Sequence, residues 1–221
     1  LSYNFNNEIA ADMYYQRKVG EEMIQIQKLN DIVNNRGGLI RTSDMLAANI
    51  KSHEIRKLVQ DGVIERIRQG YYQLAGNEDI SEEALIASLF PDGIICMYTA
   101  LFYHGYSNRT PNGWDIAVDK NTSKSRFKLD YPYVHPYYLE PHLLTFGVTT
   151  GDYSGIKMKI FDRDRLICEC LKYEDKMDRE TYNKAIQGYV ADPGKNITKL
   201  LEYAQKRRVL QKVKHKIGVW L

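Results

Sequence analysis

Apolar residues recur at helical spacing near the start of the chain, between Met23 and Asn35. The spacing of three and four residues is carried by Ile26, Leu29, Ile32 and Val33. Such a pattern predicts an amphipathic helix with one buried face. Gly37 and Gly38 predict the end of this helix, because glycine readily takes the left-handed conformation of a C-cap. A two-residue extended stretch, Leu39–Ile40, is expected to follow.

Two shorter helices are predicted next, each opened by a polar residue that can accept a hydrogen bond from the first free N–H groups. Thr42 or Ser43 is expected to cap the second helix, and Ser52 the third. Asn49 falls at the tight turn between them. The third helix has an inward apolar stripe of Ile55, Leu58 and Val59, and an outward polar face of His53, Arg56, Lys57 and Gln60.

A two-stranded hairpin is predicted after the third helix, which Asp61–Gly62 ends. Strand character runs from Val63 to Ile67, Arg68–Gly70 predicts a turn, and Tyr71–Leu74 predicts the returning strand. Helix, short strand, helix, turn, helix and hairpin together make a winged helix-turn-helix. We place this predicted domain at residues 22–76.

The third helix of such a domain fits the width of the DNA major groove, where side chains near its N-terminus reach base edges. The wing would lie along the backbone or in a minor groove, and Arg36 would join other arginines in neutralising phosphates. The predicted DNA contacts of this domain are Arg41, Thr42, Ser43, Ser52, His53, Arg56, Lys57, Arg66, Arg68 and Gln69. Winged helices also serve as protein–protein modules, but the basic, hydrogen-bonding face of the third helix favours DNA.

Residues 77–221 form the second predicted domain, of the α+β class. Strand character is found at 114–118, 145–149 and 157–161. Helices are expected from Ser81 onward, at Thr99–Tyr103 in a buried position, and from Asp164 to Met177. Two more are expected after the caps Asp178 and Asn196. The first of these runs to about Val190, and the second has a break near Arg208. The Tyr- and Pro-rich segment Leu129–Glu140 is interpreted as an extended loop packed on the domain, with base or peptide stacking as the alternative. The predicted architecture is therefore a winged helix-turn-helix followed by a larger α+β domain with a small sheet and a helical C-terminus.

Positive charge is concentrated at the C-terminal end, although the whole chain of 221 residues carries only +3. From Lys195 to Leu221, eight Lys and Arg residues are opposed by Glu202 alone, which gives +7 and leaves −4 (3 less 7) for the remainder. A basic end on a slightly acidic body favours a polyanionic partner. Five of these residues are predicted to extend the DNA surface, with a solvated helix face as the alternative: Lys206, Arg207, Arg208, Lys212 and Lys214.

Cysteine content and hydropathy favour a cytoplasmic protein. No apolar run approaches the roughly 20 residues that a membrane span needs, and no signal sequence opens the chain. Three cysteines cannot all pair within one chain, and Cys168-x-Cys170 without a second ligand pair is weak evidence for zinc. We expect Cys96, Cys168 and Cys170 to be buried, reduced thiols, with no metal, cofactor or membrane partner.

An enzyme is the strongest rival interpretation, because Asp115 and Asp119 flank a predicted strand and paired carboxylates bind catalytic magnesium. Four residues along a strand separate them by about 13 Å, which is too far to share one ion. The chain contains no Gly-x-x-x-x-Gly-Lys phosphate loop. His104 is interpreted as a core histidine with one hydrogen bond, and Asp162–Arg165 as an ion-pair cluster at a helix start. No catalytic site is therefore predicted.

Five segments closely resemble one known family: GGLIRTSD at 37–44, LVQDGVIER at 58–66, GYY at 70–72, TALFYHG at 99–105 and FDRDRLICECLKYEDK at 161–176. They are similar to the AbiEi family, the antitoxin regulators of AbiE-type abortive-infection, or type IV toxin–antitoxin, systems. The N-terminal motif is shared with many winged-helix regulators, whereas its combination with the last two segments is much more specific. The resemblance covers roughly residues 23–215.

This resemblance implies a phage-defence protein encoded beside a nucleotidyltransferase-like toxin. Its N-terminal domain would repress the shared promoter by binding double-stranded operator DNA with repeated half-sites. Its C-terminal domain would counter the toxin without needing a stable complex. Two alternatives stay open: a stand-alone winged-helix transcription factor whose second domain binds a ligand or a protein, and a nucleic-acid-modifying enzyme with a winged-helix guide.

Overall fold

The computed structural model describes residues 23–24, 26–33, 38–76, 80–129 and 131–218. The chain divides into two compact units, Leu1–Ser81 and Glu82–Leu221. The predictions for Arg36 and Gly37 lie outside the described residues. Within those residues, no helix is long and apolar enough to cross a membrane.

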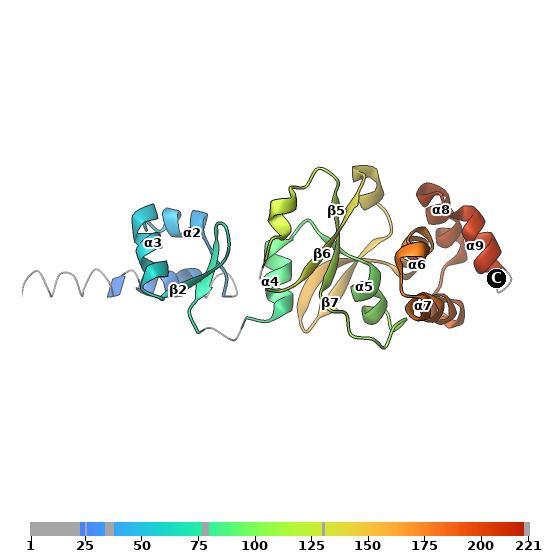
Figure 1. Cartoon of the computed structure of the whole chain (residues 1–221), viewed down its shortest axis with the longest axis horizontal. Helices are drawn as coiled ribbons and strands as arrows, with labels where there is room; N and C mark the ends of the chain where they lie inside the picture. Colours follow the sequence, from blue (N-terminus) through green and yellow to red (C-terminus); the bar gives the residue numbers. More distant parts are fainter. Residues whose placement is uncertain (1–22, 25, 34–37, 77–79, 130, 219–221) are drawn as a thin grey trace, which may run out of the picture. The chain divides into compact units, whose positions relative to one another are not determined.

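The N-terminal unit is a winged helix-turn-helix, as predicted (Figure 1). Residues 26–33 are helical. The elements that follow are β1 (Ile40–Arg41), α2 (Thr42–Ala47), α3 (Ser52–Gln60), β2 (Ile64–Arg68) and β3 (Tyr71–Leu74). The strands form an antiparallel sheet in the order β1-β3-β2, so β3 is the central strand and the hairpin of β2 and β3 is the wing.

The helices of this unit pack on one small apolar core. Its buried members are Leu29, Ile40, Met45, Ile50, Ile55, Leu58 and Ile64. Gly38 ends the first helical segment at φ +95°, and its N–H donates to the carbonyl of Val33 at 3.0 Å. Asn49 takes φ +63° in the turn between α2 and α3, as its place in the sequence predicts. The inward stripe of α3 is confirmed at Ile55 and Leu58, which are both buried.

The predicted caps of α2 and α3 are wrong. Helix α2 begins at Thr42 with Arg41 at the N-cap, and its first N–H, that of Thr42, donates to the Gly70 carbonyl at 2.9 Å. The wing thus supplies the acceptor that a capping hydroxyl would have supplied. At α3 the N-cap is Lys51, whose N–H donates to the Glu54 carboxylate at 2.6 Å, and Ser52 is the first helical residue.

The second unit is built on a five-stranded mixed sheet. Its elements are α4 (Glu82–Leu89), β4 (Ile94–Ile95), α5 (Met97–Tyr103), β5 (Trp114–Asp119), η1 (Lys124–Phe127), β6 (Val134–Leu139), η2 (Pro141–Leu144), β7 (Val148–Tyr153), β8 (Ile156–Phe161), α6 (Arg163–Lys172), η3 (Glu174–Lys176), α7 (Arg179–Ala191), α8 (Ile197–Arg207) and α9 (Leu210–Lys216). The strand order is β6-β5-β4-β8-β7. The outer pairs are β5–β6, which is parallel, and β7–β8, which is antiparallel.

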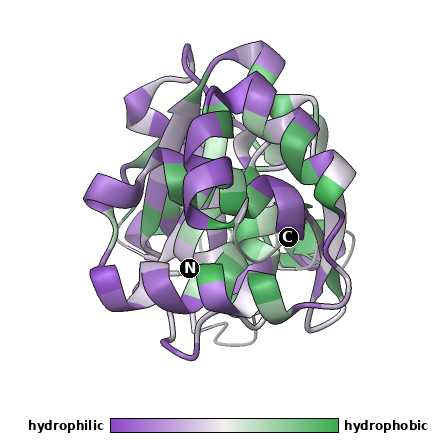
Figure 2. Ribbon diagram, turned by 90° about the vertical axis from the view of Figure 1, so that its right-hand side faces the viewer, coloured by the Kyte–Doolittle hydropathy of each residue, from purple (hydrophilic) through white to green (hydrophobic). Residues whose placement is uncertain are grey.

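Helices α6 to α9 gather at the C-terminal end of this unit (Figure 1). Along them hydrophilic and hydrophobic residues alternate, as amphipathic helices require (Figure 2). The predicted caps Asp178 and Asn196 are confirmed, because their side chains accept hydrogen bonds from the N–H groups of Thr181 and Lys199. The predicted break near Arg208 is also confirmed, since Arg208 ends α8 at φ +58°.

Four predictions for this unit need correction. The helix expected to run to Met177 ends at Lys172, and a short 3-10 turn follows. The strand expected at 145–149 begins at Val148, because its partner β8 pairs from Val148 onward. The Tyr- and Pro-rich segment is not a loop throughout: Val134–Leu139 forms the edge strand β6. Helix α5 is only partly buried, with Phe102 46% exposed.

Candidate nucleic-acid interface

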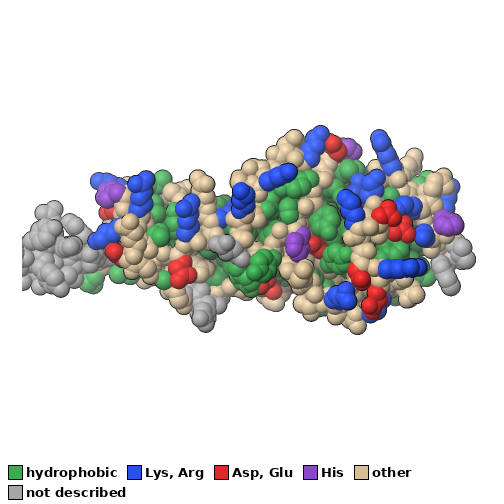
Figure 3. All heavy atoms as spheres, viewed as in Figure 1, with side chains coloured by type: hydrophobic (Ala, Val, Ile, Leu, Met, Phe, Trp, Pro, Cys, Tyr) green, Lys and Arg blue, Asp and Glu red, His purple; other side chains and the backbone are tan. Residues whose placement is uncertain are grey.

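Helix α3 exposes a continuous polar face on the side opposite its buried residues. The exposed side chains are Ser52, His53, Arg56, Lys57 and Gln60. Residues three and four apart on a helix are neighbours, so His53, Lys57 and Gln60 form one row, with Arg56 beside it. Lys, Arg and His side chains lie over the region of α3 in the space-filling view (Figure 3). This face can present cationic and hydrogen-bonding groups to base edges in a groove.

The wing brings a second set of polar side chains to the unit. Arg66 and Gln69 are exposed and Arg68 is half-buried. Arg68 lies in strand β2 rather than in the turn, which consists of Gln69 and Gly70. The pairing of β2 with β3 is irregular between Arg66 and Arg68, so Arg68 pairs directly with Tyr71. The irregularity moves Arg68 to the tip of the wing, next to the start of α2.

Arg41 and Arg68 meet at one aromatic ring. The guanidinium carbon of Arg68 lies 4.1 Å from the ring centroid of Tyr71, and that of Arg41 lies 5.7 Å from the same centroid. Both distances fall within the range of cation–π contacts. Tyr71 therefore brings together two predicted phosphate ligands, Arg68 from the wing and Arg41 from the N-cap of α2. The sequence predicts for Tyr71 only a place in a strand. This common neighbour could not be found from spacing, because the contacts depend on strand register.

The charge of this unit is positive. Residues 38–76 contain six Lys and Arg (Arg41, Lys51, Arg56, Lys57, Arg66 and Arg68) and four Asp and Glu (Asp44, Glu54, Asp61 and Glu65), a difference of +2. A basic excess on a winged helix favours a partner with negative charge, as nucleic acid has.

The residues of this candidate interface lie in a region that matches a known protein family. Residues 27–75 match the family of AbiEi antitoxin transcriptional regulators. The AbiEi match covers α2, α3 and the wing, and it agrees with the part of the family resemblance that the N-terminal segments carry. It supports a transcriptional regulator with an antitoxin role.

The AbiEi match does not extend to the second unit, whereas a similarity to a solved structure does. The chain is similar to the RV2827C protein from Mycobacterium tuberculosis in its crystal structure, with a TM-score of 0.62 and 11% sequence identity. The similarity covers 89% of this chain and 77% of that chain, so the two proteins share a fold. Comparison with the curated proteins finds no match.

The basic C-terminal end does not form the predicted five-residue stripe. Arg207 is only 5% exposed, and its Nε and Nη2 donate to the carboxylate of Glu169 at 2.6 Å each. Arg207 is thus unavailable to a phosphate, and that part of the prediction is wrong. Lys206 pairs with Glu202 at 2.7 Å, and Lys212 donates to Glu174 at 3.1 Å.

Arg208 and Lys214 are exposed and form no ion pair within the part of the chain that the structure describes. Their positions follow from the end of α8. Arg208 leaves the helix in the left-handed conformation, and Lys214 lies on the following helix α9. These two side chains are the best remaining candidates for additional phosphate contacts from the second unit.

The charged residues at the start of α6 form ion pairs, as predicted, but their partners lie outside the segment. Arg165 is fully buried and donates from Nε to Glu169 at 2.7 Å. Asp164 is buried and accepts from the Tyr189 hydroxyl at 2.7 Å. Arg163 makes a more exposed ion pair, with Asp192 at 3.0 Å. This segment therefore connects the start of α6 to the C-terminal end of α7.

The two carboxylates considered for catalysis have separate structural roles. Asp115 is buried in β5 and accepts from the N–H of Thr99 at 3.3 Å and from Nδ1 of His135 at 3.2 Å. Burial raises the pKa of Asp115, while the nearby His135 lowers it. Asp119 accepts from the backbone and side-chain amides of Asn121 at the end of the strand. Among the described residues, no group of three or more His, Cys, Asp and Glu could hold a metal ion.

The cysteines are buried, as predicted, whereas His104 is half-buried and makes the one hydrogen bond expected of it. The Nε2–H of His104 donates to the Phe161 carbonyl at 2.9 Å, and burial lowers the pKa of its imidazole. Cys96, Cys168 and Cys170 are buried free thiols. Burial raises the pKa of all three thiols, which makes them poor nucleophiles.

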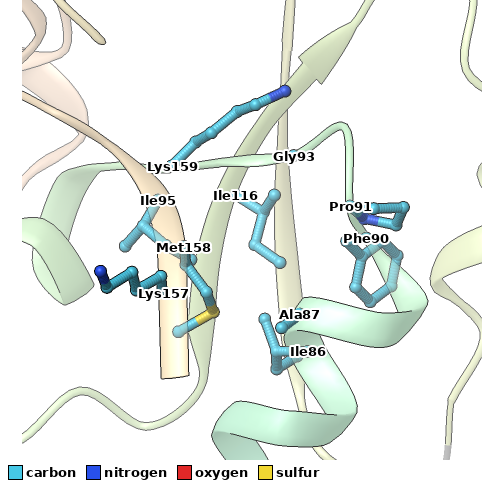
Figure 4. A pocket seen from close by; sticks show the side chains of 10 residues that line it. All are labelled: Ile86, Ala87, Phe90, Pro91, Gly93, Ile95, Ile116, Lys157, Met158 and Lys159. Atoms are coloured by element: carbon cyan, nitrogen blue, oxygen red, sulfur yellow. The ribbon is translucent and has the colours of Figure 1, made fainter. Parts of the chain in front are cut away.

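A cavity of about 210 Å³ lies between α4 and the strands β4, β5 and β8 (Figure 4). Its apolar lining includes Ile86, Phe90, Ile95, Ile116 and Met158. Lys157 and Lys159 contribute only their stems, because their ammonium groups point away from the apolar side chains (Figure 4). The labelled side chains therefore lack the convergent polar groups that fix a small ligand in most binding sites.

Proposed function

We propose that this protein is a sequence-specific DNA-binding antitoxin that represses its own toxin–antitoxin operon. The observation that carries the proposal is the exposed face of α3, with Arg56, Lys57 and His53 on a winged helix that matches AbiEi regulators. In this proposal α3 enters the major groove of an operator with repeated half-sites. Arg56 and Lys57 then read base edges, because both lie in the first two turns of the helix.

The remaining predicted contacts fix the protein on the DNA backbone. Arg41, Arg66 and Arg68 neutralise phosphates, and Gln69 at the tip of the wing reaches the backbone or a minor groove. Thr42, Ser43 and Ser52 lie at the starts of α2 and α3, where hydroxyl groups can bind phosphate oxygens. Such contacts carry no sequence information, so they set affinity and register rather than specificity.

The second unit is proposed to counter a nucleotidyltransferase-like toxin of a type IV, phage-defence system in the cytoplasm. This part rests on the resemblance of its segments 99–105 and 161–176 to AbiEi proteins. No cofactor is needed for it, and a stable complex with the toxin is not required. The protein is proposed to be non-enzymatic, because Asp115 and Asp119 are each committed to hydrogen bonds within the fold. Magnesium-dependent turnover that Asp115→Asn abolishes would contradict this.

The proposal is tested by selecting DNA from a randomised duplex library with the full chain. The selected duplex is then placed before a reporter gene, and repression is measured with and without the protein. A selected site that also occurs upstream of the protein's own gene is the expected result. Failure to enrich any sequence at physiological salt would contradict sequence-specific binding.

The stand-alone transcription factor is the second candidate, and its effector would be an apolar molecule, because the cavity beside α4 has an apolar lining without convergent polar groups. An effector bound in that cavity would change operator affinity. Growth rescue separates the two candidates. An antitoxin restores growth of cells that express a toxin encoded beside it, whereas a stand-alone regulator has no such neighbour and gives no rescue.

A further inference from the structure

We infer that Tyr71 holds Arg41 and Arg68 together as a single phosphate-binding pair. The sequence alone predicts only that each arginine contacts DNA separately. The structure places their guanidinium carbons 5.7 and 4.1 Å from one tyrosine ring. The inference rests on the proposed function, because it concerns how the winged helix grips the DNA backbone, and it assigns Tyr71 as a positioning residue that need not touch DNA itself.

Strand register produces this arrangement. Tyr71 lies on the central strand β3, opposite Arg41 on β1 and opposite Arg68 on β2. Residues directly opposite each other in antiparallel strands have their side chains on the same face of the sheet. The next residue, Tyr72, packs against the apolar core with Ile40. Alternation along the strand therefore turns Tyr71 and its two arginines to the face away from that core.

The wing tip is held at the start of α2, which fixes the relative position of the two arginines. The Gly70 carbonyl accepts from the N–H of Thr42, the residue after Arg41, at 2.9 Å. Gly70 takes φ +82°, a conformation that favours glycine. A Cβ at Gly70 would meet the Thr42 hydroxyl at 3.8 Å, so the two segments are adjacent. The turn that follows Arg68 is thus anchored to the start of α2, and the Arg68 guanidinium lies over the Tyr71 ring.

Electrostatics explains why the ring is needed. Two guanidinium groups repel each other, and free arginine side chains sample many rotamers, so an unsupported pair would be spread apart. The face of an aromatic ring attracts a guanidinium group and so limits the positions that the two arginine side chains take.

The chemistry of the pair identifies its ligand as a DNA phosphodiester. Planar guanidinium groups match phosphate oxygens through paired N–H donors, and two of them on neighbouring strands can hold two adjacent phosphates. A phosphate contact is the same on every sequence. Loss of the pair should therefore weaken binding to the operator and to unrelated DNA by the same factor.

The experiment compares Tyr71→Leu with Tyr71→Phe in the full chain. Fluorescence anisotropy with the library-selected duplex and with a scrambled duplex gives both affinities. Tyr71→Leu should weaken both by about tenfold, and Tyr71→Phe by less than about twofold, because phenylalanine keeps the ring face. In the Tyr71→Leu background, Arg68→Ala should cost much less than in the natural protein, since the pair is already dispersed.

A measurement without DNA tests the geometry itself. The arginine side-chain NMR signals of Arg41 and Arg68 should move when Tyr71→Leu removes the ring current, while Tyr71→Phe leaves them nearly in place. Thermal unfolding of both variants shows that the fold is intact.

Three outcomes would overturn the inference: full binding by Tyr71→Leu, equal weakening in Tyr71→Phe, or a weakening confined to the selected sequence. In each of these the natural protein still binds DNA, so the proposed function survives. If the natural protein binds neither duplex, both fail.

Discussion

Glu169 on α6 accepts two hydrogen bonds from Arg207 on α8, from Nε to Oε1 and from Nη2 to Oε2, each at 2.6 Å. Arg165 also donates to Glu169, and all three charged groups of this cluster are buried. The guanidinium carbon of Arg165 lies 4.1 Å from the centroid of Phe146 and 4.6 Å from that of Phe161. One carboxylate therefore joins α6 to α8.

Removing the charge of Glu169 should destabilise the second unit strongly. Glu169→Gln leaves two buried guanidinium groups without a counter-charge, and breaking such a buried pair typically costs about 3–5 kcal/mol. Urea unfolding of the full chain measures the change. The control is Glu202→Gln, whose exposed pair with Lys206 should contribute less than about 1 kcal/mol. Equal unfolding midpoints for the two variants would contradict a stabilising role of the cluster.

Gly147 should tolerate no side chain, because of Arg165. It takes φ +64°, and a Cβ there would lie 2.5 Å from the Cβ of Arg165. Gly155 is the matched control, since it takes φ +87° and a Cβ there would meet nothing within 4 Å. Gly155→Ala should cost about 1–2 kcal/mol from the backbone alone, and Gly147→Ala a further 1–3 kcal/mol or so from overlap. A Gly147→Ala protein as stable as Gly155→Ala would show that the core relaxes around the new methyl group.

His104 should make the fold sensitive to mild acid. Burial lowers its pKa, so as pH falls below about 6.5 the unfolded chain binds a proton that the folded chain does not. Stability is therefore fully present above that pH and is lost as pH falls toward the lowered pKa. Unfolding curves between pH 8 and pH 5.5 should show a smaller loss for His104→Gln than for the natural protein. Parallel pH profiles would contradict this assignment.

Local rules predict much of the fold, and long-range contacts account for the errors. The stripe of Ile55 and Leu58 and the caps Asp178 and Asn196 depend only on neighbouring residues, so spacing identifies them. The sequence places Arg207 on the surface because its partner Glu169 lies on another helix, 38 residues earlier. No local pattern indicates such a pair.

In the candidate site, too, some features follow from neighbouring residues and others from long-range contacts. The outward face of α3 follows from helical periodicity, so its residues can be predicted from the sequence. The caps of α2 and the role of Tyr71 depend on the wing, whose Gly70 carbonyl reaches Thr42 and whose register sets Arg68 opposite Tyr71. Register and backbone contacts between separate elements are not encoded in the spacing of one element.

The C-terminal unit should add phosphate contacts through Arg208 and Lys214. Removing each of these cations should flatten the slope of log affinity against log salt by about 0.9, because one fewer phosphate is neutralised. The double variant Arg208→Gln, Lys214→Gln is compared with Lys157→Gln, Lys159→Gln, which removes the same charge from the exposed side chains of strand β8. A lower slope only in the first variant is expected. An unchanged slope together with failed growth rescue would assign these residues to the antitoxin role instead.

Operator binding by a triple alanine variant at Arg56, Lys57 and Arg68 tests the central claim most directly. A gel-shift titration compares it with the natural chain and with a charge-matched control, alanine at Lys124, Lys157 and Lys159, which are exposed in the second unit. Removing the base interaction of Arg56 alone should cost on the order of 1–3 kcal/mol, so the triple variant should bind at least about tenfold more weakly, while the control binds nearly normally. Operator affinity equal to that of the natural protein, in a folded triple variant, would contradict DNA recognition by this winged helix.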